Sequence, residues 1–250
     1  MYSFFAEFYD ELMYDADYKK RTAYLMKLFK KYGKKPTLLL DVACGTGGFS
    51  NEFARLGLEV IGIDMSEEML AVAREKSAEI GTDVLYLCQK AEELDLYGTV
   101  DAAVCCMDSL NHITDYKTFH KAIERISLFL EPESLFIFDV NTEYKHRKIL
   151  GDNVFVIDRE NIYCVWANAF TTHNNTVDIM LDFFVKEGDL YTRYSEEFSE
   201  RAYTKEEIET ALYRAGLEIV DIFDDLTEKP LNSTSQRAIY VTRKQGEQIG

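Results

Sequence analysis

A short apolar strand that runs directly into a glycine-rich turn and then into a helix places the tightest limit on how this chain can fold. Residues 37–42 read TLLLDV, the turn 43–48 reads ACGTGG, and the next residues are typical of a helix that ends near Leu56. Glycines at such a turn permit a tight bend and a close approach of a ligand to the backbone. The order predicts the first βα unit of a parallel sheet, with a ligand at the carboxyl end of its strand.

Strand and helix patterns then alternate as far as residue 140. Apolar runs at 59–64, 84–88, 100–106 and 134–140 are separated by helical stretches, and a helix at 205–215 and strands at 217–223 and 237–243 follow later. Such alternation produces βαβ units with right-handed crossovers. We therefore expect an α/β fold with a doubly wound, mostly parallel, seven-stranded sheet, built from residues 36–150 and 202–250. Residues 1–35 are expected to form an N-terminal helical cap.

The alternation is interrupted between residues 151 and 201. Four β-rich segments occur there without a helix between them, and turn signals such as Asn174-Asn175 separate them. This pattern predicts an antiparallel β-meander inserted after the fifth strand. Ligands lie at the carboxyl ends of the strands in such sheets, so the insert is expected to cover an acceptor pocket. A surface for a homodimer is the alternative.

Composition and charge exclude several classes of protein. No apolar run reaches the length of a membrane span, and the N-terminus lacks the pattern of a signal peptide, so a cytoplasmic protein is expected. The net charge of −16 disfavours nucleic acid as a partner, and the basic cluster Lys19-Lys20-Arg21 is interpreted as a solvated helix face. Five cysteines without a CxxC pair, and histidines without HExxH spacing, predict no metal site.

Two carboxylates flank the glycine turn and suggest which ligand it binds. Asp41 ends the first strand and Asp64 ends the second, and Ser50 stands where a nicotinamide-binding GxGxxG motif has its third glycine. A carboxylate beside the turn is a poor neighbour for a pyrophosphate but a good one for an ammonium group. Asp64 can accept both ribose hydroxyls. The pair favours S-adenosylmethionine, which carries an ammonium and a sulfonium and no phosphate, although each acid alone could be a helix cap.

These segments resemble class I S-adenosylmethionine-dependent methyltransferases, in particular bacterial small-molecule enzymes with a β-meander insert. The resemblance rests on DVACGTGGFS (41–50), VIGIDMSEEML (60–70), VDAAVCCMD (100–108) and FIFDVNTEYK (136–145). It implies S-adenosylmethionine as cofactor, with a site formed by Tyr9, Asp41, Ala43, Cys44, Gly45, Thr46, Gly47, Asp64, Met65, Lys90, Ala91, Glu92 and Met107. The family often has an Asp where Lys90 stands, and a lysine cannot accept the hydrogen bond of the adenine amino group. Glu92 or Gln89 is the expected substitute, or packing and backbone groups hold adenine alone.

The side chains near the fourth and fifth strand ends are candidates for the acceptor side of the site. His112, Asp108 and Asp139 are the candidate catalytic bases, and His112 titrates near neutral pH. An exposed position for His112 and a capping role for Asp139 are the alternatives. The candidate acceptor contacts are Asn111, Asn141, Trp166, Arg201 and Tyr203. The sequence thus favours methyl transfer to a nitrogen or oxygen atom of a small molecule. A nicotinamide-dependent oxidoreductase and a non-catalytic S-adenosylmethionine-binding interaction protein are the other readings.

Overall fold

The computed structural model describes residues 3–13 and 16–246, and it contains two separate β-sheets. The larger sheet is built from β1 (Leu38–Val42), β2 (Glu59–Asp64), β3 (Val84–Cys88), β4 (Val100–Cys105), β5 (Leu130–Asn141), β10 (Leu217–Asp224) and β11 (Arg237–Lys244). The smaller sheet is built from β6 (Val154–Asp158), β7 (Ile162–Thr171), β8 (Thr176–Glu187) and β9 (Leu190–Arg201). The first and last residues of the expected segments 1–35 and 202–250 lie outside the described part.

The seven strands of the larger sheet follow the order β10-β11-β5-β4-β1-β2-β3. Pairs among β1 to β5 are parallel, whereas β11 pairs antiparallel with both β5 and β10. β11 reverses direction because it follows β10 in a hairpin-like return rather than through a crossover helix. The predicted fold class, a mostly parallel seven-stranded sheet with a separate antiparallel meander, is confirmed.

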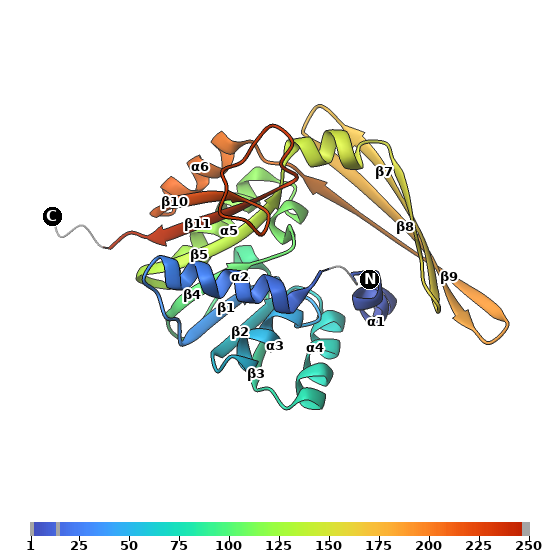
Figure 1. Cartoon of the computed structure of the whole chain (residues 1–250), viewed down its shortest axis with the longest axis horizontal. Coiled ribbons are helices and arrows are strands. Elements are labelled where there is room, and N and C mark those ends of the chain that lie inside the picture. The colour runs from blue at the N-terminus through green and yellow to red at the C-terminus, as the bar shows by residue number, and fades with distance from the viewer. Residues whose placement is uncertain (1–2, 14–15, 247–250) are drawn as a thin grey trace.

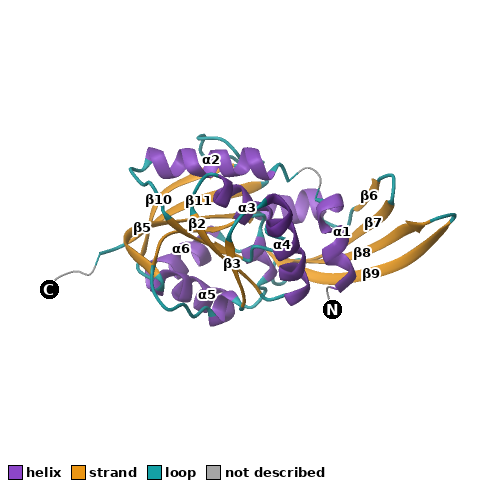
Figure 2. Ribbon diagram, turned by 90° about the horizontal axis from the view of Figure 1, so that it is seen from below, coloured by secondary structure: helices purple, strands orange, loops and turns teal. Residues whose placement is uncertain are grey.

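Helices cover both faces of the larger sheet, and the strand sequence explains why. Successive strand residues point to opposite faces, so Leu39 packs with α2 (Tyr18–Lys31) and α3 (Gly48–Arg55), whereas Leu40 packs on the side of α5 (Tyr116–Leu128) and α6 (Lys205–Arg214). Figure 2 shows α2 on one face and α5 and α6 on the other. α4 (Glu67–Ile80) packs against β2 and β3. Because these strands are buried on both faces, their sequences are continuous apolar runs and do not alternate between apolar and polar residues.

The smaller sheet extends from the core as an arm, and α1 (Ser3–Leu12) lies between the arm and the core (Figure 1). Burial alternates along β8, where Ile179, Leu181 and Phe183 are buried and Met180 is exposed. The buried face packs against Leu12 of α1. This face, which we call the inner face of the arm, is therefore turned toward the core.

Most predicted element boundaries agree with the structure. The start of β5, an unpredicted helical turn and the environment of Arg21 differ from the expectations. The capping box of Thr204 and Glu207 opens α6 as expected. β5 begins at Leu130, before Pro132, and a π-helical turn, η3 (Lys145–Leu150), follows it without a sequence signal. Arg21 is not part of a solvated face, because its guanidinium forms a bidentate ion pair with Asp225 at 2.8 and 3.0 Å.

Candidate cofactor and acceptor site

A large cavity of about 1040 Å³ lies at the carboxyl ends of β1, β2 and β4. Its lining comes from three directions: the strand ends of the core, α1 with the residue that follows it, and the inner face of the arm. Arg237, the first residue of β11, and the loop before it complete the lining. The position agrees with the rule that ligands of open α/β sheets bind outside the carboxyl ends of the strands.

The glycine turn lines one end of this cavity and is tied to the second strand. Asp64 accepts a hydrogen bond from the Gly45 N–H at 2.9 Å and another from the Ser66 N–H at 2.9 Å. A Cβ added to Gly45 would meet nothing within 4 Å, so the backbone there faces open space, whereas a Cβ on Gly47 would lie 2.4 Å from the Tyr86 hydroxyl. Gly45 therefore leaves room for a ligand, and Gly47 leaves room for the protein's own packing.

Asp41 lies beneath the turn rather than on the cavity wall. It is 1% exposed, and the Ser50 hydroxyl donates to its Oδ2 at 2.6 Å. Burial raises the pKa of Asp41 to about 7, against the effect of this hydrogen bond. Burial also raises the pKa of Asp64, and the N–H groups of Ser66 and Gly45 oppose the rise. A role of Asp41 toward an ammonium group stays a prediction, and it would require an intermediary such as water.

Two further turn residues, Cys44 and Thr46, are buried and support the turn from below. The Cys44 N–H donates to the Ile63 carbonyl at 2.8 Å. The Thr46 hydroxyl donates to Asp10 of α1 at 3.0 Å, and Lys76 of α4 forms an ion pair with the same carboxylate. These contacts fasten α1 over the turn and thereby hold Tyr9 in the cavity wall.

The predicted adenine end is formed by Met65, Lys90, Ala91 and Glu92, all of which line the cavity. Met65 is 60% exposed, an unusual state for a methionine beside a sheet. Gln89 exchanges two hydrogen bonds with the backbone of Asp95, at 2.9 and 3.1 Å. Of the two acceptors expected to replace the missing Asp, Glu92 therefore remains the available one.

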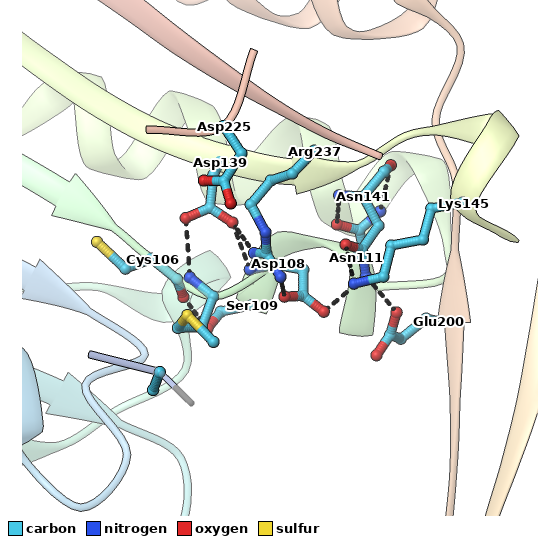
Figure 3. Close-up of polar contacts among 12 residues, drawn as sticks. Cys106, Asp108, Ser109, Asn111, Asp139, Asn141, Lys145, Glu200, Asp225 and Arg237 are labelled. Carbon is cyan, nitrogen blue, oxygen red and sulfur yellow. Dashed lines mark hydrogen bonds and ion pairs between the residues drawn. The ribbon is translucent and has the colours of Figure 1, made fainter. Parts of the chain in front are cut away.

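The end of β4 carries a strained turn held by two carboxylates and one arginine (Figure 3). Met107 and Asp108 have φ angles of 57° and 51°, and Asp139 accepts both of their N–H groups, at 2.9 and 2.7 Å. Arg237 forms ion pairs with Asp139 and, at 2.5 Å, with Asp108. Burial would raise the pKa of Asp108, but Arg237, Lys145 and His112 hold it below its ordinary range. Asp139 thus positions the turn at the end of β4 from the neighbouring strand, a role that the sequence did not predict, and Met107 and Asp108 line the cavity.

Four predicted acceptor contacts lie outside the cavity wall. Asn111 and Asn141 are buried and bond to each other, with the Asn141 N–H donating to Asn111 Oδ1 at 2.9 Å. Arg201 donates to the Thr114 carbonyl at 3.2 Å and to the Glu207 carboxylate at 2.5 Å. Tyr203 stacks on Phe119 in the core at 4.0 Å between ring centroids. The structure does not support direct acceptor contacts from these four, because none of them lines the cavity and each is held by local contacts.

Trp166 and His112 do face the cavity, and the structure adds Glu200 beside them. The Trp166 indole N–H donates to Asn168 at 2.7 Å, which leaves the ring in the wall, next to Phe155. His112 is exposed, as its alternative interpretation expected, with 44% of its side chain accessible, and its Nε2 lies 3.8 Å from Glu200 Oε1. Burial, with the nearby charge of Asp108, raises the pKa of Tyr9 above its ordinary range. A base candidate, a buried carboxylate and an aromatic wall therefore meet at one place.

Comparison with known proteins decides the family. Residues 39–133 match the model of a methyltransferase domain. The chain is 32% identical over 245 residues to YqeM of Bacillus subtilis (strain 168), which is named as a methyltransferase; the match covers 98% of this chain and 97% of that one. A methyltransferase named in Geobacillus sp. (strain WCH70) is 31% identical, with 97% and 99% covered. The crystal structure of a S-adenosylmethionine-dependent methyltransferase from Clostridium acetobutylicum ATCC 824 superposes with a TM-score of 0.90 and 32% identity, over 98% of this chain and 99% of that chain.

The chain belongs to the S-adenosylmethionine-dependent methyltransferases. Its cofactor is S-adenosylmethionine, and the nicotinamide-dependent reading is set aside. The cavity of this methyltransferase fits that group on independent grounds. Gly45 presents backbone to open space, and Asp64 has lone pairs left after its two backbone contacts.

The functional residues that sequence reasoning missed in this methyltransferase are Arg237, Glu200 and Ser50. Ser50 was noticed only as a departure from a glycine motif. It lies nine residues after Asp41, in the first turn of the predicted helix, a spacing that allows it to contact the end of the strand. Arg237 begins the last strand predicted for the sheet, at 237–243, but the sequence did not indicate which strand it would neighbour. Glu200 had none, because β9 contains three glutamates among its twelve residues and nothing in the local sequence distinguishes them.

Two negative findings apply to residues 3–13 and 16–246 of the methyltransferase. No helix there is long and apolar enough to cross a membrane. No group of three or more histidine, cysteine, aspartate or glutamate side chains in that part of the chain has a geometry suited to a metal ion.

Proposed function

We propose that this methyltransferase transfers a methyl group to a nitrogen or oxygen atom of a small molecule bound between the core and the inner face of the arm. The supporting observation is the continuous cavity of about 1040 Å³, which is lined by both Asp64 and Trp166. Pockets for one small ligand span about 300–1,000 Å³, so this volume leaves space for an acceptor beside the cofactor.

The division of the chain follows the same reasoning. In our proposal residues 36–150 and 202–250 bind the cofactor, residues 151–201 cover the acceptor, and residues 1–35 close the site from the side of α1. Leu12 supports this division because it packs on the inner face of the arm, while Asp10, two residues earlier, is bound to the glycine turn.

When bound, S-adenosylmethionine supplies a methyl carbon activated by a sulfonium leaving group. The chain's own residues would bind, orient and exclude water. Asp64 and Gly45 would hold the ribose end, and Met65, Ala91 and Glu92 the adenine. Asp139 and Arg237 would keep Met107 and Asp108 in their strained conformation. His112 would take a proton from the acceptor, and the apolar inner face, with Trp166, would keep the acceptor dry.

A ligand-binding comparison tests this proposal. S-adenosylhomocysteine at a hundredfold excess over its Kd should stabilise the protein by about 2.7 kcal/mol, and NAD should not. Gly45→Ala should remove most of that stabilisation, because its Cβ would occupy cavity space.

Gly81→Ala is the matched control. Gly81 has a φ of 72°, close to the 53° of Gly45, and open space around its Cβ, but it lies at the end of α4. Gly81→Ala should introduce a similar backbone strain and leave ligand binding intact. Stabilisation by NAD alone, or equal ligand binding by Gly45→Ala and the wild type, would refute the proposed site.

A further inference from the structure

We propose that the methyl acceptor is a primary or secondary amine, held with its nitrogen between Glu200 and His112 and its apolar body against the inner face of the arm. The inference rests on the proposed function and names the acceptor class for the same site. It is carried by the position of one buried carboxylate.

Glu200 is held at the junction of the arm and the core. Its side chain is 6% exposed and lines the cavity. Oε2 accepts a hydrogen bond from Asn141 Nδ2 at 3.0 Å and lies 3.2 Å from Nε2 of the fully buried His146 (Figure 3 shows the pair with Asn141). Two partners from the core thus fix one oxygen of the carboxylate. The other oxygen, Oε1, lies nearest to His112.

The gap between Glu200 and His112 suits a single bridging nitrogen. The distance of 3.8 Å between Oε1 and Nε2 is too long for a direct hydrogen bond. One atom can lie about 2.8 Å from both, since two such bonds span any separation up to about 5.6 Å. The His112 ring is held in place by Phe198, whose centroid is 5.0 Å away. An amine placed there would donate to the carboxylate and contact the imidazole.

The surrounding charges favour a cation over an anion. The two arginines of the cavity are already paired, Arg237 with Asp108 and Asp139, and Arg21 with Asp225. Of the two lysines of the cavity, Lys90 lies at the predicted adenine end, and the ammonium of Lys145 donates to Asn141 Oδ1 at 2.9 Å. An anionic acceptor in this part of the cavity would therefore meet arginines that are already paired and the carboxylate of Glu200.

The same carboxylate decides between nitrogen and oxygen acceptors. A buried charge is costly unless an opposite charge and hydrogen bonds compensate it. A hydroxyl can donate one hydrogen bond to Glu200 but brings no charge, whereas an ammonium supplies both. The body of the acceptor would then lie on Trp166 and Phe155, whose rings form an edge-to-face pair with centroids 5.7 Å apart.

The proposed transfer balances with the groups at hand. The bound ammonium gives one proton to His112 Nε2, which frees the nitrogen lone pair. That lone pair forms the nitrogen–carbon bond as the carbon–sulfur bond of the cofactor breaks. The electron pair of the broken bond stays on sulfur, and the positive charge passes from sulfur to nitrogen.

Three small probes of one shape test the acceptor class: 2-phenylethylamine, 2-phenylethanol and 3-phenylpropionate. Their Kd values are measured by calorimetry at pH 7.5 on protein saturated with S-adenosylhomocysteine. We expect the amine to bind at least tenfold more tightly than the alcohol and the carboxylate. Glu200→Gln should remove this preference, while the Kd of S-adenosylhomocysteine stays within twofold. Glu197→Gln is the matched control, because Glu197 lies on the same strand and is exposed.

The outcomes separate this inference from the proposed function. Equal or absent binding of the three probes to a wild type that binds S-adenosylhomocysteine would overturn the amine and leave methyl transfer standing. A wild type without affinity for S-adenosylhomocysteine would remove both. If Glu200→Gln does not fold, the ranking of the probes on the wild type still decides the class. A preference that survives in folded Glu200→Gln would overturn the role of Glu200.

Discussion

The two ends of the cavity are built in different ways. The glycine-turn end draws its lining from residues 43–69 and 89–92, which follow the three consecutive parallel strands β1, β2 and β3. The arm end draws Tyr9, Lys145, Trp166, Glu200 and Arg237 from five separate elements or loops. A site made within one local unit can be recognised from a short motif. A site made between distant elements has no motif, and its chemistry depends on how the elements pack.

Arg237 holds the ends of β4 and β5 together in the cavity wall, and its loss should have the largest effect. Arg237→Met leaves Asp108 and Asp139 buried without their cation, a change that costs about 3–5 kcal/mol. Urea unfolding measures the loss. Arg243→Met, farther along the same strand, breaks only a partly exposed contact of 3.9 Å with Glu133 and should cost little. Equal effects of the two changes would show that the ion-pair cluster does not hold the cavity together.

The glycine-turn end should impose its own pH dependence through Asp41. Its folded pKa of about 7 lies above its unfolded value, so the stability associated with the protonated carboxyl is complete below pH 4 and is lost as pH rises toward 7. The loss amounts to about 2–4 kcal/mol in ligand-free protein. Asp41→Asn should therefore gain stability relative to the wild type between pH 4 and pH 8. Asp83→Asn, at an exposed site, is the control, and parallel curves for all three proteins would contradict the assignment.

Asp64 sharpens the comparison because it should affect only the cofactor end. Asp64→Ala removes the hydrogen bonds expected to the ribose. It should weaken the binding of S-adenosylhomocysteine by about 1.5–3 kcal/mol. Calorimetry measures the change in affinity. Asp101→Ala is the control, because Asp101 lies near the amino end of β4, away from the cavity at the carboxyl ends of the strands. Unchanged affinity in a folded protein would place the ribose elsewhere.

Trp166 should do the reverse and affect only the arm end. Trp166→Ala should weaken 2-phenylethylamine by about 1–2 kcal/mol through lost apolar contact and leave S-adenosylhomocysteine unchanged. Arg201→Ala should change neither affinity, because its guanidinium is bound to Thr114 and Glu207, but it should lower stability. Light scattering on both variants tests the alternative of a homodimer. If either change converts a dimer to a monomer, the arm is primarily a dimer interface and not a cover for the acceptor.

Lys90 should have the smallest effect. Lys90→Asp places a carboxylate where related enzymes have one, and Glu92 already lines that part of the cavity. We expect S-adenosylhomocysteine binding to tighten by less than about 1 kcal/mol or to stay equal. A marked loss of affinity at unchanged stability would reveal a contact of Lys90 that the cavity lining does not suggest.

Neighbouring residues on one strand show where sequence reasoning stopped. Arg201 was predicted to contact the acceptor because it is a basic residue at the exit of an acidic meander. Glu200, the residue before it, lines the cavity instead, and Phe198 lies on the same face. A strand turns successive side chains to opposite faces, so a shift of one residue decides the role. The sequence predicted β9 but not which of its faces meets the core.

The sequence by itself determined the elements, the sheet, the glycine turn and the type of cofactor, because these depend on periodicity and on contacts within a few residues. Only the tertiary structure decided the acceptor end. Packing of α1 on the arm, Arg237 between two carboxylates, and Glu200 between His146 and His112 join residues far apart in the sequence, and Arg237 and Asp108 are separated by 129 positions. Such pairs form because a buried charge needs a partner of opposite charge. The partner can come from any part of the chain, so the local sequence does not reveal which residue it is.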